Sequence, residues 1–280
     1  MTIRARTILF SLLFFLLPVS PASAAPPPAV YFVKADGIIN PVMAEFIIKS
    51  IELAAREKAE AVVIELDTPG GLDLSMRDIV KSELGSEVPV AVYVYPSGSR
   101  AASAGVFITY AANIAAMAPG TNIGSAHPVE MGGGKMDETM AKKVENDAVA
   151  YIMGIAAKRK RNAQWAERAV RESLNVTAEE ALKLKVIDLV VDGREGLIRE
   201  LDGRRVEVPG GARTLETKGA EIKNIEMNLR FRVLSAISNP NVAYILMMIG
   251  LAGLYFELSN PGLILPGVIG AVCLVLAFYA

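Results

Sequence analysis

The sequence predicts an α/β domain with a parallel sheet, followed by an apolar helical hairpin. Short, almost entirely apolar segments alternate with segments of helical periodicity between residues 30 and 191, as in βαβ units. Two apolar runs close the chain, Val242–Leu258 and Leu263–Ala280, and Glu257 is the only charged residue in them. The folded part is about 200 residues long, which is enough for one well-buried domain.

The predicted strands are short and apolar, which is typical of parallel strands covered on both faces. Asp67-Thr-Pro-Gly-Gly71 ends the second of them sharply. We expect strands at Val30–Val33, Ala61–Leu66, Val90–Tyr95, Ala115–Ala118 and Lys185–Val191.

The predicted helices carry apolar residues at helical spacing. Pro41 suits the first turn of the first helix, and Thr177 with Glu180 has capping-box spacing. The expected helices are Val42–Glu57, one from Asp73 or Ser75 through Leu84, Ser103–Ile114, residues 137–160 and Thr177–Leu184. In the helix at 137–160 the apolar side consists of Met140, Val144, Ala148, Tyr151, Ile152 and Ile155. Residues 203–240 lack strong periodicity and are interpreted as a linker or small subdomain that follows a domain at 25–202.

Residues 1–24 are typical of a secretory signal peptide. Arg4 and Arg6 precede an apolar core at Ile8–Pro18, and Ala22-Ser23-Ala24 is a small-residue cleavage site. The alternative is an uncleaved anchor, but this core is shorter than the about 20 residues that span a bilayer. The domain at 25–202 is therefore expected on the extracytoplasmic side of a cell membrane.

Residues 241–280 are expected to form two transmembrane helices, with Asn260-Pro261-Gly262 as the turn. Arg230 and Arg232 flank the first span on its expected outer side, against the positive-inside tendency. The second run reaches Ala280 without a polar exit, so a longer parent chain is expected.

Composition excludes several functions. The net charge of −1 includes no basic stripe, so a nucleic-acid partner is not expected. Cys273 is the single cysteine, and no His, Asp or Glu cluster has metal-ligand spacing. The sequence also lacks a phosphate-binding glycine loop, and we expect neither metal nor cofactor.

Ser103 is the candidate nucleophile. It stands in Pro96-Ser-Gly-Ser-Arg-Ala-Ala-Ser-Ala-Gly105, between a predicted strand and a predicted helix. Only small residues flank it, so its hydroxyl is accessible at a helix N-terminus, where free N–H groups favour negative charge. The backbone N–H groups of Gly71 and Ala104 are the candidate oxyanion hole, because parallel strands present their following loops at one sheet edge. A plain turn is the alternative for Pro69-Gly-Gly71.

Three motifs carry a family resemblance: Asp67–Gly71, Ala102-Ser-Ala-Gly105 and Ala116-Met-Ala-Pro-Gly-Thr-Asn-Ile-Gly124. In this order and spacing they resemble the NfeD family of membrane-bound serine proteases, within the wider ClpP/crotonase superfamily. The resemblance implies a ClpP/crotonase-like ββα superhelix domain followed by membrane spans. Longer family members carry further spans and a small C-terminal β-barrel of the OB type.

The resemblance implies a Ser-Lys dyad with Lys143 as the general base. Such a lysine must be neutral, which burial and the like charge of Lys142 favour. Lys142 and Lys135 remain alternatives on the same helix and the preceding Gly-rich loop. His127, 24 residues after Ser103, is the rival base, with an orienting acid expected around Arg171-Glu172-Ser173.

The expected function is an ATP-independent serine endopeptidase that cleaves hydrophobic segments of membrane proteins. By resemblance its partners are stomatin-like (SPFH) proteins, and it forms a homo-oligomer. One alternative is a non-catalytic membrane scaffold for stomatin-like proteins. Another is a crotonase-type acyl-CoA enzyme that uses the Gly70-Gly71 backbone on a thioester; export and the lack of a basic cluster for CoA phosphates argue against it.

Overall fold

The computed structural model describes residues 28–129, 137–260 and 264–279, and the structural statements below concern these residues. The predicted signal peptide at 1–24 and the Gly-rich loop Met131–Lys135 lie outside the described residues. So does most of the turn Asn260-Pro261-Gly262.

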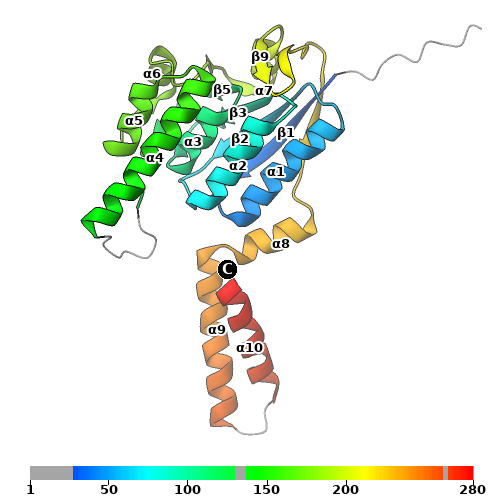
Figure 1. Ribbon diagram of the computed structural model, residues 1–280. Coiled ribbons are helices and arrows are strands. Elements are labelled where there is room, and N and C mark those ends of the chain that lie inside the picture. The colour runs from blue at the N-terminus through cyan, green and yellow to red at the C-terminus, as the bar shows by residue number, and fades with distance from the viewer. Residues whose placement is uncertain (1–27, 130–136, 261–263, 280) are drawn as a thin grey trace, which may run out of the picture.

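A six-stranded parallel sheet forms the centre of the folded domain (Figure 1). Its order is β11-β1-β2-β3-β5-β8. Strands β2 and β3 are buried along nearly their whole length, as their continuous apolar sequences predict. The strands are β1 (Ala29–Asp36), β2 (Ala61–Asp67), β3 (Val90–Val94), β5 (Ile114–Met117), β8 (Leu189–Val190) and β11 (Glu221–Ile225).

The two faces of this sheet bury different cores. Alternate strand residues such as Val33, Ile64 and Val92 pack in the larger core with α1 to α5, and their neighbours Phe32 and Val63 pack in the smaller core beside α7. The helices are α1 (Pro41–Arg56), α2 (Asp73–Gly85), α3 (Ala104–Ala111), α4 (Glu138–Arg159), α5 (Ala163–Arg171), α6 (Ala178–Lys183) and α7 (Gly193–Leu201). The predicted α/β fold with a parallel sheet is confirmed.

A second, three-stranded sheet lies beside the carboxyl end of the first and leads the chain into the serine turn. Strand β4 (Arg100–Ala102) pairs in parallel with β6 (Asn122–Gly124), and β6 pairs antiparallel with β7 (Asn175–Thr177). A single bridge between Thr68 and Ala101 joins β4 to the segment after β2. Thr177 then caps α6 in the predicted capping box with Glu180.

Several predicted boundaries differ from the structure. Helix α3 ends at Ala111 instead of Ile114, because Ile114 begins β5 and an apolar helix followed by an apolar strand shows no break in periodicity. The last predicted strand, Lys185–Val191, pairs only at Leu189–Val190. At α2 neither Asp73 nor Ser75 is the cap; Leu72 holds that position, and Asp73 pairs with Arg77 at 2.8 Å.

Residues 203–240, expected as a linker or small subdomain, contribute a strand to the main sheet. Strand β11 pairs in parallel with β1, with Ala29 opposite Glu221 and Val33 opposite Ile225. A hairpin of β9 (Arg205–Val208) and β10 (Gly211–Thr214) precedes it, and helix α8 (Leu229–Ile237) follows. The weak periodicity of β11 reflects its place at the sheet edge, where several of its side chains stay in contact with solvent.

The carboxyl end forms two adjacent apolar helices that extend away from the folded domain, α9 (Pro240–Ser259) and α10 (Ile264–Tyr279) (Figure 1). By length and composition, Asn241–Ser259 is the one described helix that is long and apolar enough to cross a membrane, whereas Ile264–Phe278 is shorter. Their backbones touch: a Cβ on Gly253 would lie 2.9 Å from the Cα of Gly270. Small residues permit such close packing between membrane helices.

Candidate active site

Ser103 occupies a strained turn between β4 and α3. Its φ of 52° and ψ of −112° lie in a region that non-glycine residues rarely adopt. The side chain is partly exposed, and the backbone N–H of Ser103 donates to the carbonyl oxygen of Gly124 at 3.1 Å. Strain of this kind persists where the surrounding structure enforces it, as at the nucleophile turns of α/β hydrolases.

Gly70 lies directly against the Ser103 side chain. An ideal Cβ on Gly70 would lie 2.6 Å from the Cβ and 3.1 Å from the Oγ of Ser103, and Gly70 has a φ of +121°. Both the conformation and the contact therefore require glycine at this position. The Gly70 N–H donates to the Thr68 hydroxyl at 3.0 Å, which holds the turn in place. Pro69-Gly-Gly71 is thus built around the serine and is more than a plain turn.

The predicted oxyanion residues Gly71 and Ala104 lie on the two segments that meet at Ser103. Gly71 forms a parallel bridge with Ile39, in which Ile39 N–H donates to the Gly70 carbonyl and Leu72 N–H donates to the Ile39 carbonyl. This pattern leaves the Gly71 N–H outside the ladder. Ala104 is the first residue of α3, where a helix leaves its N–H groups unpaired. Among the described hydrogen bonds, neither N–H has an acceptor, and Ala104 is buried (4%).

Lys143 lies on the N-terminal half of α4, which extends beyond the neighbouring helices α3 and α5 (Figure 1). The lysine is exposed. Met140 (48%) and Val144 (36%) are exposed too, although the sequence predicts them on the apolar side of this helix that faces the core. The prediction that Met140 and Val144 belong to a buried apolar side is therefore wrong for the single chain, and they do not bury Lys143. Farther along α4, Ala148, Ile152 and Ile155 are buried as predicted.

The alternative lysines have different surroundings. Lys142 pairs with Glu138 at 2.8 Å on the surface of α4, and Lys135 lies outside the described residues.

His127 is partly exposed, and its Nδ1 lies 3.0 Å from the carbonyl oxygen of Val170. The acid expected nearby does not orient it: the Glu172 carboxylate pairs with Arg168 at 2.9 Å. Among the described hydrogen bonds, none joins the hydroxyl of Ser103 to Lys143 or to His127.

Two contributors to the site were not singled out from the sequence. Thr68 supports Gly70 through its hydroxyl, and Gly124 accepts the hydrogen bond of the Ser103 N–H. The Asp67 carboxylate accepts from the Arg100 N–H at 3.0 Å and so joins the end of β2 to the start of β4. Thr68 and Gly124 both lie within the sequence motifs around Ser103, which could have drawn attention to them. Their hydrogen-bond partners, however, are set by strand pairing, which the sequence pattern does not show.

An α/β domain with a serine at a strained turn, followed by an apolar helix long enough to cross a membrane, has the arrangement of a membrane-anchored α/β protein. Residues 29–203 match the family described as "NfeD1b, N-terminal domain", and residues 241–280 match "NfeD integral membrane domain". The chain belongs to the NfeD family.

Two curated relatives support this assignment. Membrane-bound protease PH1510 of Pyrococcus horikoshii is 35% identical over 277 residues, which cover 97% of this chain and 62% of the relative. Membrane protein NfeD1b of Bacillus subtilis is 28% identical over 280 residues, covering 95% of this chain and 59% of the relative. The chain therefore spans about three fifths of the length of these relatives.

Solved structures of similar chains are those of 1510-N, described as a membrane protease specific for a stomatin homolog from Pyrococcus horikoshii. That structure is 33% identical, covers 76% of this chain and 100% of the other, and superposes with a TM-score of 0.67. A lysine-to-alanine mutant in complex with a substrate peptide gives a TM-score of 0.70 at 33% identity, with 76% and 99% covered. A serine-to-alanine mutant gives 0.68 at 34% identity, with 73% and 100% covered.

Proposed function

We propose that this protein is a membrane-anchored, ATP-independent serine endopeptidase in which Ser103 is the nucleophile. The observation that carries the proposal is the strained Ser103 at the N-terminus of α3, with Gly70 packed against its side chain. A serine that is partly exposed and fixed by its backbone is suited to covalent catalysis. The relative 1510-N, a protease characterised with serine and lysine mutants, supports the same chemistry.

In the proposed reaction Lys143 accepts the proton of the Ser103 hydroxyl while Oγ attacks a peptide carbonyl carbon. The carbonyl oxygen becomes an oxyanion, which accepts hydrogen bonds from the N–H groups of Gly71 and Ala104. Each such donor contributes about 3–4 kcal/mol to the stability of the transition state. The C–N bond then breaks, the amine leaves with the proton, and water hydrolyses the acyl-serine ester.

A neutral Lys143 requires desolvation, because a solvated ammonium carries its proton at neutral pH. In this chain Lys143 is exposed, so we infer that the bound substrate and a second copy of the chain cover it. The exposed Met140 and Val144 beside it supply apolar surface for such contacts. The homo-oligomer proposed here therefore completes the base side of the site.

The proposed substrate is a hydrophobic segment of a membrane protein, with stomatin-like (SPFH) proteins as partners. The support is the stomatin specificity of 1510-N, together with the apolar hairpin that holds the domain at a bilayer. We also propose that the catalytic domain lies on the extracytoplasmic side of the cell membrane, as the signal-like sequence at residues 1–24 predicts.

The test is cleavage of an apolar peptide by the full chain in detergent or vesicles. Ser103→Ala should lower kcat by about 10⁶-fold, as removal of a serine nucleophile does in other proteases. Ser99→Ala is the matched control, because Ser99 lies in the same loop but is buried. Retained cleavage by the Ser103→Ala variant would contradict the mechanism.

The same assay tests two alternatives, His127 as the general base and a non-catalytic scaffold. His127 is the alternative base: the Nδ1 contact with the Val170 carbonyl orients the ring with Nε2 as its acceptor. Loss of activity in His127→Gln with full activity in Lys143→Met would transfer the role to His127. A chain that binds a stomatin-like partner but cleaves no peptide would be a scaffold, the alternative that the exposure of Lys143 favours.

A further inference from the structure

Helix α8 lies between the folded domain and the first membrane span, outside both regions matched to the family, 29–203 and 241–280. One side of α8 is attached to the domain: Phe231 is 5% exposed, and its ring centroid lies 5.5 Å from that of Phe46 on α1. This packing fixes the rotation of α8 about its own axis. It therefore also determines which side chains α8 directs away from the domain.

The opposite side of α8 is an exposed apolar stripe, which consists of Leu229, Val233 and Ala236. Leu229 is 75% exposed and Val233 is 49% exposed, and the spacing of four and three residues places all three on one face. Arg230 and Arg232 are exposed and lie on either side of this stripe by helical geometry. An exposed apolar face bordered by arginines is the pattern of a helix that lies in a membrane interface.

The connection to the membrane span limits where this stripe can lie. Only Ser238 and Asn239 separate the end of α8 at Ile237 from the start of α9 at Pro240. Such a connection reaches at most about 11 Å, at about 3.6 Å per residue. A polar interface borders the hydrocarbon core on each side of a bilayer, and α8 is therefore held at that depth when α9 spans the core.

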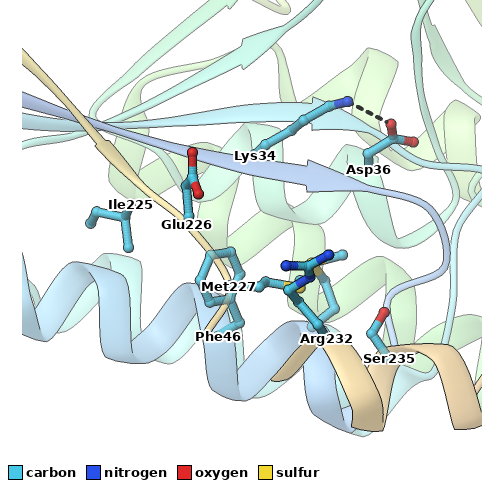
Figure 2. A pocket seen from close by; sticks show the side chains of 9 residues that line it. Lys34, Asp36, Phe46, Ile225, Glu226, Met227, Arg232 and Ser235 are labelled. Carbon is cyan, nitrogen blue, oxygen red and sulfur yellow. Dashed lines mark ion pairs between the residues drawn. The ribbon is translucent and has the colours of Figure 1, made fainter. Parts of the chain in front are cut away.

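Charge complementarity favours lipid over a protein partner as the occupant. The Arg230 guanidinium pairs with Glu45 at 3.5 Å, but 62% of the arginine side chain is exposed, so it can also reach a phosphate. Arg232 lines a cavity of about 370 Å³ between α8, α1 and the ends of β1 and β11, and in that cavity Lys34 pairs with Asp36 at 3.0 Å (Figure 2). Arginine guanidinium groups bind phosphate oxygens in a bidentate manner.

We propose that α8 docks on the bilayer, with Leu229 and Val233 inserted at the boundary between headgroups and acyl chains and with Arg230 and Arg232 bound to lipid phosphates. This gives Arg230 and Arg232, which run against the positive-inside tendency, a role as headgroup ligands. It also sets the orientation of the domain. Asp36, at the end of β1, lines the same cavity as Arg232, and Ile39, three residues later, bridges to Gly71. The edge of the sheet that carries Ser103 is thereby held toward the membrane surface.

The test is the depth of spin labels on the full chain in phosphatidylcholine vesicles with and without phosphatidylglycerol. Single cysteines are introduced as Leu229→Cys and Val233→Cys in a Cys273→Ala background. The control is Leu182→Cys on α6, which is also an exposed apolar position (41%) but lies on another part of the domain. Labels at 229 and 233 are expected ~5–10 Å below the lipid phosphates, accessible to oxygen and shielded from a water-soluble nickel complex, while the control label stays in water.

Three results would contradict the proposal in whole or in part. Labels at 229 and 233 that collide with the nickel complex as often as the control would place the stripe in water. Labels shielded from both oxygen and nickel would place it against protein, such as a second copy. The Arg230→Gln, Arg232→Gln double variant should abolish the deeper insertion that phosphatidylglycerol causes at position 233. An unchanged dependence on this lipid would reject the role of the arginines. The readout is independent of peptide cleavage.

Discussion

The surroundings of Ser103 and of Lys143 differ: in a single chain Ser103 is held in place by its neighbours, whereas Lys143 is exposed. Around Ser103, strand pairing, a strained backbone and the contact with Gly70 fix the nucleophile in one position. Around Lys143, the N-terminal half of α4 stands away from the core, with Met140 and Val144 in solvent. The proposed nucleophile is thus organised by folding alone, whereas the proposed base, Lys143, is exposed and would depend on contacts that folding of one chain does not provide.

This difference has a physical basis in what each group needs. A nucleophile needs position, which rigid neighbours supply, and a lysine base needs a low-dielectric environment, which only burial supplies. A site whose base is desolvated by substrate together with a second copy is inactive until both are present. In the proposed membrane-tethered protease, such a requirement would limit the cleavage of unrelated proteins.

After the loss expected for Ser103→Ala, the largest expected effect concerns Lys143, the proposed base. Lys143→Met should lower kcat/KM by about 10²–10⁴, the range for loss of a general base. Lys142→Met is the matched control, since Lys142 neighbours it on α4 and pairs with Glu138 on the surface. Steady-state cleavage of an apolar peptide measures both variants. Equal losses in the two would show that charge on this helix face matters, and not one particular lysine.

Substitutions in the two halves of α4 should differ in their effect on the free energy of unfolding. Ile152→Ala removes a fully buried side chain and should destabilise the protein by about 2–5 kcal/mol. Val144→Ala, at a 36% exposed position four residues from Met140, should change the stability by no more than about 0.5 kcal/mol. Thermal or denaturant unfolding of the domain signal in detergent measures both. A large cost for Val144→Ala would mean that this half of α4 is buried in solution.

The contact between Gly70 and Ser103 can be broken by one methyl group. Gly70→Ala should lower kcat by about 10²-fold, because a displacement of the nucleophile by about 1 Å has an effect of that size. Gly211→Ala controls for backbone strain: Gly211 has a similar φ of +116°, with no atom within 4 Å of an added Cβ. Peptide cleavage and unfolding of both variants are compared. Equal activity would refute the positioning role of Gly70.

The smallest expected effect is a pH-dependent change in stability at Glu83, a buried residue of α2. Glu83, at the end of α2, is fully buried, and burial raises its pKa well above its usual range despite the fields of Arg159 and Arg161. Such a group favours folding at low pH, and this contribution declines as the pH rises above about 4.3, the value in the unfolded chain. Glu83→Gln should therefore raise the stability at pH 8 by about 1 kcal/mol, or about 2–4 °C in Tm.

At pH 4 the Glu83→Gln variant and the parent protein should melt at nearly the same temperature, because the parent carboxyl is then protonated in both states. Melting curves at the two pH values test this. A variant that is less stable at pH 8 than at pH 4, relative to the parent, would show that Glu83 is ionised and paired with the arginines.

Much of the fold followed from local pattern. The apolar strands β2 and β3, the capping box at Thr177 and the apolar helices α9 and α10 lie where the sequence predicts them, because periodicity and caps depend on neighbouring residues. Strand β11 was missed, because an edge strand with exposed side chains carries little of that signal.

The sequence by itself determined that Ser103 stands at a small-residue turn between a strand and a helix, since that depends on local chain chemistry. Only the tertiary structure decided that Gly70 packs against Ser103, that His127 contacts the Val170 carbonyl and that Lys143 is exposed. Each of these facts depends on segments at least 30 residues apart or on what surrounds a helix face. Such contacts are set by how the elements pack, which periodicity and spacing do not encode.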